Sequence, residues 1–198
     1  MSLRLRLAGL WTPEGTMRRE LLHVEEVTNE ALDSLLRARI PGYSPPSLDQ
    51  GEQDLEGIRA RMARGHRRRV DAFLGELGRE EGTSSGREAL FRAGVQLGRE
   101  ARARLRVGDS AKDLERAAMV LYRVLGIEIS VSISDGKGRM RVSRCSLSPH
   151  YSESTCAVLS AADEGMVQGL SPRAEMRFQE CITSGRRECL ALIDFREG

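Results

Sequence analysis

The chain has 198 residues, of which 31 are Lys or Arg and 29 are Asp or Glu, so its formal net charge is only +2. This balance, with an aromatic content of 4%, argues against a dedicated nucleic-acid surface, which needs excess positive charge or exposed rings for stacking. No apolar stretch approaches the roughly 18 to 20 residues that cross a bilayer, and the beginning of the chain is too rich in Arg for a signal peptide. We therefore expect a cytoplasmic protein with no membrane and no nucleic-acid partner.

The first two thirds of the sequence predict an arm and then four helices. Residues 1–19 are rich in Gly, Pro and Arg and are interpreted as the arm. Apolar residues then recur with the spacing of a helix face in four segments. These helices are expected at 19–39, about 47–78, 87–106 and 110–125, with Ser47 or Asp49 capping the second and Asp109 or Ser110 the fourth. The polar stretch 80–86 is expected to break the chain between the second helix and the third.

At Gly126 the apolar pattern changes from the period of a helix to that of a strand. Residues 127–133 alternate between apolar and polar, and Asp135-Gly136 predicts a tight turn to a partner strand at 140–145. The remaining elements are expected to be a helix at 154–170 and strands at 174–182 and 188–195. The sequence therefore predicts an α+β fold, with N-terminal helices packed on a small antiparallel sheet of β-β-α-β-β order.

The four cysteines, Cys145, Cys156, Cys181 and Cys189, all lie in the last part of the chain. The expected elements place the first at a strand end, the second at a helix start and the last two beside a turn. Because cytoplasmic thiols stay mostly reduced, metal binding, inert burial and a redox pair are all open. Four soft thiolates match the ligand count of tetrahedral zinc or of an iron–sulfur cluster, although no C-x-x-C spacing is present.

The histidines give weaker signals. His23 and His66 fall on charged helices and are expected at the surface, as is the basic run 64–69. His150 lies between Cys145 and Cys156 in a predicted loop and is an additional candidate ligand. No P-loop, dinucleotide fingerprint, G-x-S-x-G or H-E-x-x-H motif is present, so the common enzyme classes find no support.

Four stretches resemble one known family. The segment Cys181-Ile-Thr-Ser-Gly185-Arg-Arg-Glu-Cys189 has the C-x3-G-x3-C form that closes 4-vinyl-reductase-type domains. The stretch from Cys156 to Gly165, the stretch Phe91-Arg-Ala-Gly94-Val-Gln-Leu-Gly98 and the stretch Val124-Leu-Gly126-Ile-Glu-Ile resemble three other parts of that family. The likeness covers roughly residues 86–196.

This family is similar in fold to the Bet3 subunits of the TRAPP vesicle-tethering complex. The resemblance implies a TRAPP/Bet3-like domain with an apolar pocket for a small apolar or aromatic ligand, a sensor role, and zinc held beside the pocket by Cys156, Cys181 and Cys189. Family members commonly have an acidic ligand three residues before the Cys181 position, where this chain has Phe178. Cys145 is the natural replacement, with Glu180 and His150 as further candidates.

A second resemblance is to proteins of the L-2-amino-thiazoline-4-carboxylic acid hydrolase-like family. Those proteins have a Cys before the helix, a helix with Cys and then Asp, and a terminal G-x3-C turn. Here these features correspond to Cys145, to Cys156 with Asp163, and to Gly185 with Cys189. This resemblance implies a hydrolase in which Cys156 and Asp163 are the catalytic candidates.

These observations predict an arm at 1–19, a helical extension at 20–85 and a ligand-binding domain at 86–198. The extension is expected to serve as a dimer interface, as a lid, or as a dock for another protein. The leading hypothesis is a homodimeric, non-enzymatic binding or sensor protein with a structural zinc ion. The alternatives are a hydrolase, a thiol redox switch and an iron–sulfur protein.

Overall fold

The computed structural model describes residues 3–46 and 54–196, and its elements have the α+β order expected from the sequence. The helices are α1 (Leu3–Leu10), α2 (Glu14–Arg39), α3 (Leu55–Leu77), α4 (Arg79–Leu105), α5 (Ala111–Val124) and α6 (Glu153–Leu170), with short 3-10 turns η1 (Ser148–His150) and η2 (Ile182–Ser184). The strands are β1 (Ile127–Ser134), β2 (Lys137–Cys145), β3 (Ala174–Glu180) and β4 (Cys189–Phe195). The predicted fold class and the β-β-α-β-β order are confirmed.

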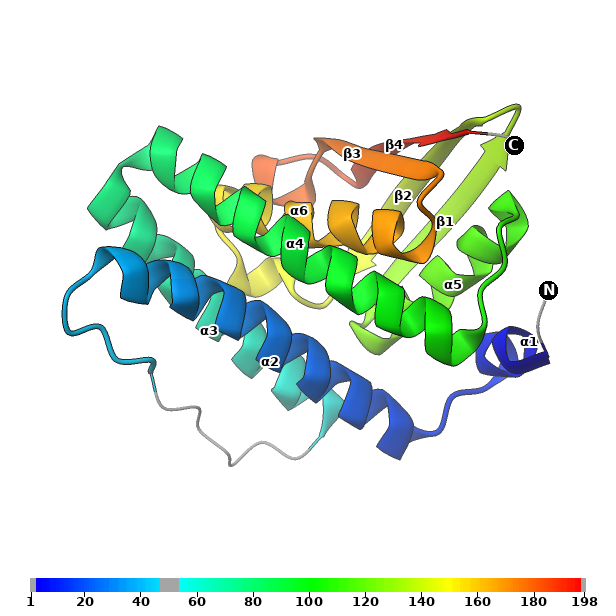
Figure 1. Cartoon of the computed structure of the whole chain (residues 1–198), viewed down its shortest axis with the longest axis horizontal. Coiled ribbons are helices and arrows are strands. Elements are labelled where there is room, and N and C mark those ends of the chain that lie inside the picture. The colour runs from blue at the N-terminus through cyan, green and yellow to red at the C-terminus, as the bar shows by residue number, and fades with distance from the viewer. Residues whose placement is uncertain (1–2, 47–53, 197–198) are drawn as a thin grey trace.

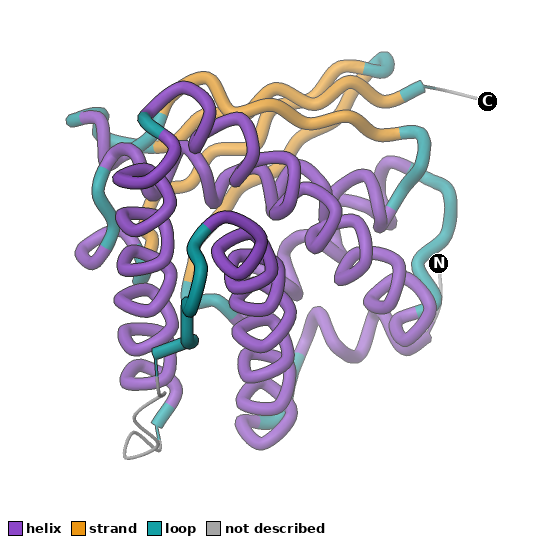
Figure 2. The backbone as a smooth tube through the Cα atoms, turned by 60° about the vertical axis from the view of Figure 1, so that its left-hand side comes forward, coloured by secondary structure: helices purple, strands orange, loops and turns teal. Residues whose placement is uncertain are grey.

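The four strands form one antiparallel sheet in the order β1-β2-β4-β3. Asp135 and Gly136 both have positive φ, at 51° and 71°, as the tight β1–β2 turn requires, so the predicted hairpin is confirmed. Side chains along the strands alternate between more buried and more exposed positions, because one face of the sheet packs on helices. Figures 1 and 2 show the strands as an outer layer, with α5 and α6 beneath them, α4 across α6, and α2 and α3 farthest from the sheet.

Glycines bring α4 and α6 into backbone contact. A Cβ atom added to Gly94 would lie 2.0 Å from the carbonyl oxygen of Ala162, and one added to Gly165 would lie 2.1 Å from that of Phe91. Gly98 and Gly169 make equivalent approaches one turn farther along. No larger residue fits at these positions without moving a helix. These four glycines therefore set the distance between the two helices.

The predicted break at 80–86 is wrong, because these residues lie inside α4. Gly82 and Gly86 are buried where α4 turns back along α3, and their missing side chains leave room for Leu74 and Phe73. Helix packing thus explains small residues that the sequence pattern assigned to a loop. The segment interpreted as an arm also contains helix, namely α1 and the first turns of α2.

The helix caps agree in part with the sequence. Ser110 caps α5 as predicted, since its side chain accepts a hydrogen bond from the amide of Asp113. Ser47 and Asp49 lie outside the described residues, and Asp54 caps α3 by accepting from the amide of Gly57 at 2.7 Å.

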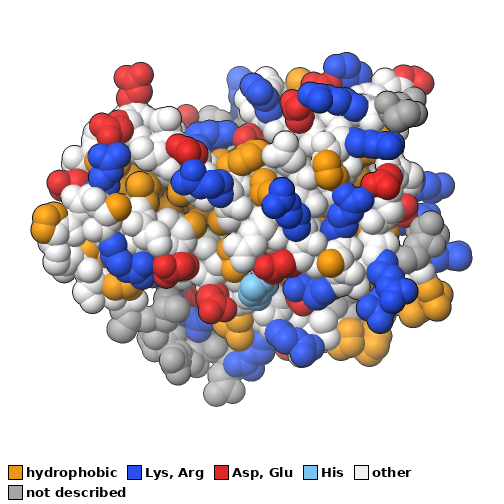
Figure 3. All heavy atoms as spheres, in the orientation of Figure 1, with side chains coloured by type: hydrophobic (Ala, Val, Ile, Leu, Met, Phe, Trp, Pro, Cys, Tyr) orange, Lys and Arg blue, Asp and Glu red, His pale blue; other side chains and the backbone are white. Residues whose placement is uncertain are grey.

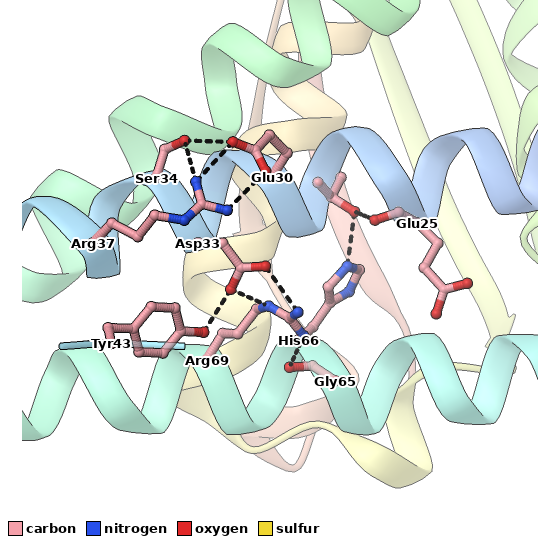
Figure 4. Close-up of polar contacts among 10 residues, drawn as sticks. Glu25, Glu30, Asp33, Ser34, Arg37, Tyr43, Gly65, His66 and Arg69 are labelled. Atoms are coloured by element: carbon pink, nitrogen blue, oxygen red, sulfur yellow. Dashed lines mark hydrogen bonds and ion pairs between the residues drawn. The ribbon is translucent and has the colours of Figure 1, made fainter. Parts of the chain in front are cut away.

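Buried ion pairs join α2 to α3 (Figure 4). The Arg69 guanidinium donates to both carboxylate oxygens of Asp33, at 2.7 and 2.9 Å, and only 3% of Arg69 is exposed. The Tyr43 hydroxyl donates to the same carboxylate at 2.6 Å. About two turns earlier on both helices, Arg61 pairs with the buried Glu25 at 2.6 Å. The predicted solvated character of the run 64–69 is therefore wrong for Arg69, because a carboxylate from α2 neutralises its charge.

Among the described residues, no helix is both long enough and apolar enough to cross a membrane.

Candidate functional site

A cavity of about 90 Å³ lies between the helices and the edge of the sheet. This volume is about that of three waters in the liquid, and is smaller than the roughly 150 Å³ that holds benzene in an engineered cavity. Helices α2 to α6 and strand β1 all contribute to the wall, which is mainly apolar. The apolar lining residues are Val24, Met62, Leu97, Ala101, Leu121, Val124, Leu125, Ile127, Leu147, Leu159, Ala162 and Met166. The cavity wall therefore includes both the predicted helical extension at 20–85 and the predicted domain at 86–198.

A chain of three polar side chains crosses one side of the cavity. Nε2 of His66 lies 2.8 Å from the Thr28 hydroxyl, and Nδ1 lies 2.8 Å from the Tyr151 hydroxyl (Figure 4 shows the first contact). The Thr28 hydroxyl donates its proton to the carbonyl of Val24 at 2.7 Å, so it accepts from His66. The imidazole is therefore protonated on Nε2 and accepts from Tyr151 on Nδ1.

His66 is neutral because it is buried. Burial, and secondarily the charge of Arg69, lowers the pKa of His66 to about 3. The prediction that His66 is a surface residue is wrong, since only 2% of it is exposed. A signal was present in the sequence: His66 continues the four-residue repeat of Ile58 and Met62 on the buried face of α3.

Asp163 on α6 supplies the carboxyl group of the cavity wall. Burial raises the pKa of Asp163 to about 7, while the hydroxyl of Tyr122 lowers it and nearby negative charge on Cys156 raises it further. The Tyr122 hydroxyl is itself buried and makes no hydrogen bond of normal geometry. A buried hydroxyl without such a bond is costly in an apolar interior.

Two ion pairs between α2 and α4 lie at the cavity mouth. His23 contacts Glu100 at 2.6 Å, and Arg104 contacts Glu20 at 2.5 Å. His23 is partly exposed, in agreement with its predicted surface location. Among the described lining residues, the charged cationic groups are at this mouth, so none of them neutralises Asp163 in the interior.

Three of the four cysteines are close enough to affect one another's pKa. Cys156 lies in the first turn of α6, Cys181 precedes η2, and Cys189 begins β4. The Cys181 thiol interacts with both other sulfurs, which raises the pKa of Cys181 and lowers that of Cys156 and that of Cys189, the last to about 7. The amide of Ile182 also donates to the Cys189 sulfur at 3.2 Å.

The turn itself explains how the chain brings these thiols together. Gly185 has φ of +84°, a conformation that favours glycine, and it folds the segment between Cys181 and Cys189 back on itself. Cys145, at the end of β2, is close enough for its charge to interact with that of Cys156, but burial raises the pKa of Cys145 to about 11.

The further candidate ligands are Glu180 and His150. Glu180 pairs with Arg186 at 4.0 Å, and His150 ends the η1 turn. Within the described residues, which include all four cysteines, no three His, Cys, Asp or Glu side chains are placed to hold a metal ion. Metal binding at this position therefore stays a prediction.

No family model and no curated protein matches the chain. Among solved structures, trafficking protein particle complex subunit 3 from Naegleria fowleri, covalently bound to palmitic acid, aligns with a TM-score of 0.54 and 12% identity, over 70% of this chain and 95% of that one. The two proteins share a fold. The TRAPP/Bet3-like fold predicted from the sequence is thus confirmed, while membership of the 4-vinyl-reductase-type or hydrolase-like family stays a prediction.

Two other solved structures align less well. The phenol-responsive sensory domain of the transcription activator PoxR has a TM-score of 0.47 and 19% identity, over 84% of this chain and 89% of that one. An H-NOX protein from S. oneidensis has a TM-score of 0.45 and 14% identity, over 90% of this chain and 98% of that one.

Proposed function

We propose that this protein binds a small, mainly apolar molecule in the cavity between its helices, with Asp163 as the polar contact. The observation that carries this proposal is an apolar hollow with a carboxyl group in its wall, whose pKa burial raises to about 7. Pockets for small molecules commonly combine an apolar wall with a few such polar groups. The palmitic acid on the trafficking-complex subunit supports an apolar ligand on this fold, but a cavity of 90 Å³ requires a much smaller one.

The electrostatics of the interior restrict the ligand further. Asp163 is negative whenever it is ionised, so an anionic ligand is repelled. A neutral or cationic molecule with one hydrogen-bond donor satisfies the carboxyl group and places the rest of its surface on the apolar wall. We propose this ligand class.

Phenol and toluene test the proposal because they have nearly the same shape but differ in the donor. Both are larger than the resting cavity, so their binding requires the wall at the mouth between α2 and α4 to move outward. We expect phenol to bind about tenfold more tightly than toluene in calorimetric titrations, as one buried hydrogen bond to a charged group supplies that difference. Benzoate should not bind. Asp163→Leu should abolish the preference for phenol while leaving toluene binding intact. Equal affinity of phenol and toluene for the wild-type protein contradicts the role of Asp163.

The location of the site is tested by changing its volume. Ala162→Leu fills the cavity and should abolish binding, whereas Leu97→Ala enlarges it and should strengthen phenol binding. Ala103→Leu, on the exposed face of α4, is the matched control and should leave the affinity unchanged. Unchanged phenol affinity in all three variants places the ligand elsewhere.

We also propose that the four cysteines bind a structural metal ion, which we expect to be zinc. Cys156, Cys181 and Cys189 are three of the ligands, and Cys145 is the fourth. The support is that three thiols from separate elements affect one another's pKa, and that the pKa values of Cys156 and Cys189 are lowered. Zinc prefers thiolates, and four protein ligands give a closed site without an open position for catalysis. Bound metal would fasten α6 to the β3–β4 turn, directly beside the cavity wall.

Metal analysis of freshly purified protein tests this second proposal. We expect about one equivalent of zinc, its loss in Cys181→Ser, and a lower unfolding temperature after chelation. An iron–sulfur cluster instead gives a brown protein with visible absorbance. Less than half an equivalent of either metal overturns the proposal.

The sensor role, the homodimer and the hydrolase alternative with Cys156 and Asp163 stay predictions. Light scattering measures the oligomeric state. Alkylation of Cys156 followed by an assay of thiazoline hydrolysis tests the enzymatic alternative.

A further inference from the structure

Helix α1 presents an exposed apolar surface. Leu3, Leu7, Leu10 and Trp11 have 70%, 56%, 82% and 73% of their surface exposed, and we call these four residues the α1 patch. Leu5 faces the opposite way and is fully buried, so it anchors the helix to the protein core. The spacing of Leu3, Leu7 and Leu10 places them along one side of the helix. Figure 3 shows hydrophobic side chains gathered with basic ones over α1, at the edge of the molecule.

Basic side chains surround the patch. Arg4 and Arg6 lie on α1 itself and are exposed, and residues 3–11 contain no Asp or Glu. On the neighbouring helix α5, Arg123 donates to the carbonyl of Gly9 at 3.1 Å and fixes the position of α1. Arg123 also lines a shallow hollow together with Arg6, Leu10 and the half-exposed Met119. The patch therefore combines exposed Leu and Trp side chains with positive charge.

We propose that α1 binds the surface of an anionic lipid bilayer, with the α1 patch inserted among the headgroups and the arginines contacting lipid phosphates. Tryptophan prefers the boundary between headgroups and acyl chains, and Arg side chains beside it gain from the negative surface potential. The location of α1 at the edge of the molecule lets it meet a flat surface (Figure 1). Such contact with a surface requires no membrane-crossing helix.

Charge favours a lipid surface over a second copy of the chain. A symmetric dimer through α1 would place each patch against its own copy, and would bring Arg4, Arg6 and Arg123 close to the same three residues of the partner. Like charges facing each other oppose such an interface. An anionic bilayer supplies the opposite charge to all of them at once.

Trp11 is the only tryptophan in the chain, so its fluorescence reports directly on this surface. The full-length protein is titrated with vesicles of phosphatidylcholine alone and with vesicles containing one third phosphatidylserine. We expect a blue shift of the Trp11 emission and co-sedimentation with the anionic vesicles, at an affinity about tenfold higher than for neutral vesicles, weakening as salt is raised. No shift and no co-sedimentation at low salt overturns the proposal.

The double variant Leu7→Gln, Leu10→Gln retains Trp11 and changes only exposed side chains, so it should fold normally and bind at least about tenfold more weakly. Leu192→Gln is the matched control, because Leu192 is 43% exposed on the outer face of β4, and it should bind like the wild-type protein. Equal binding by the double variant overturns the proposal. A dimer that forms without lipid and is lost in the double variant also overturns it, in favour of a contact between copies of the chain.

Discussion

The backbone contact between α4 and α6 makes a quantitative prediction for Gly94→Ala. A Cβ atom at this position would lie 2.0 Å from the Ala162 carbonyl oxygen and 2.9 Å from the amide nitrogen of Met166. Carbon and oxygen atoms that are not bonded stay more than about 3 Å apart, so α4 and α6 must separate locally by about 1 Å. Neither obstructing atom is in a side chain that can rotate away, and the strain therefore falls on helix packing.

The expected cost follows from two opposing effects. Overpacking a rigid contact destabilises the folded state by up to about 3 kcal/mol. Alanine in place of glycine inside a helix returns about 1 kcal/mol. Gly94→Ala should therefore lower the free energy of unfolding by about 2 kcal/mol, which for a chain of this length lowers the unfolding temperature by about 4–8 °C.

Gly75 provides the matched control because it lies inside α3 with no atom within 4 Å of an added Cβ. Gly75→Ala should gain the higher helix propensity of alanine without a clash, and should raise the free energy of unfolding by up to about 1 kcal/mol. Urea unfolding followed by circular dichroism measures both variants. If Gly94→Ala is as stable as Gly75→Ala, the close packing of α4 on α6 is refuted. The same separation should also weaken phenol binding, because α4 and α6 both line the cavity.

Three further predictions concern charged and thiol groups. Arg69→Met leaves Asp33 buried without its partner and should lower the free energy of unfolding in urea by about 3–5 kcal/mol. Adding Asp33→Leu to Arg69→Met should recover part of this loss. No recovery would contradict the ion-pair argument. Burial raises the pKa of Asp163 from 3.8 to about 7, so between these pH values the folded state holds a proton that the unfolded state has released. The stability of the wild-type protein relative to Asp163→Asn should therefore fall by at most about 4 kcal/mol between pH 4 and pH 7. A stability difference that does not change with pH would exclude a raised pKa. At pH 8, iodoacetamide should label Cys156 before Cys145 in peptide mass spectrometry, since the pKa of Cys156 is lowered and that of Cys145 is raised to about 11; equal labelling rates would contradict these shifts.

Local sequence rules explain most of the secondary structure. The change from helical to alternating spacing at Gly126, the Asp135-Gly136 turn and the Ser110 cap depend on neighbouring residues alone, so the pattern predicts them directly. The same rules fail for residues 80–86, where small residues serve contacts between helices. A loop and a tight helix crossing require similar residues, and only the partner helix distinguishes them.

The location of the cysteines within the elements was also predictable, because each lies beside an element boundary that the sequence marks. The sequence could not show which of the cysteines interact with one another. Cys181 interacts with both Cys156 and Cys189, whereas Cys145 lies beside them with a raised pKa. This arrangement depends on how α6 meets the β3–β4 turn.

The sequence by itself determined the α+β order, the hairpins and the concentration of thiols near the end of the chain, since these follow from side-chain spacing and turn chemistry over a few residues. Tertiary structure alone decided the environment of His66, Arg69 and Asp163. Each looks like an ordinary polar residue of a charged or mixed helix. A distant helix packs over His66 and Arg69 and buries them, and Asp163 becomes part of a cavity wall to which several helices contribute. Burial and long-range partners set the charge state of these groups, and the chemistry of the cavity therefore depends on packing between segments far apart in the chain.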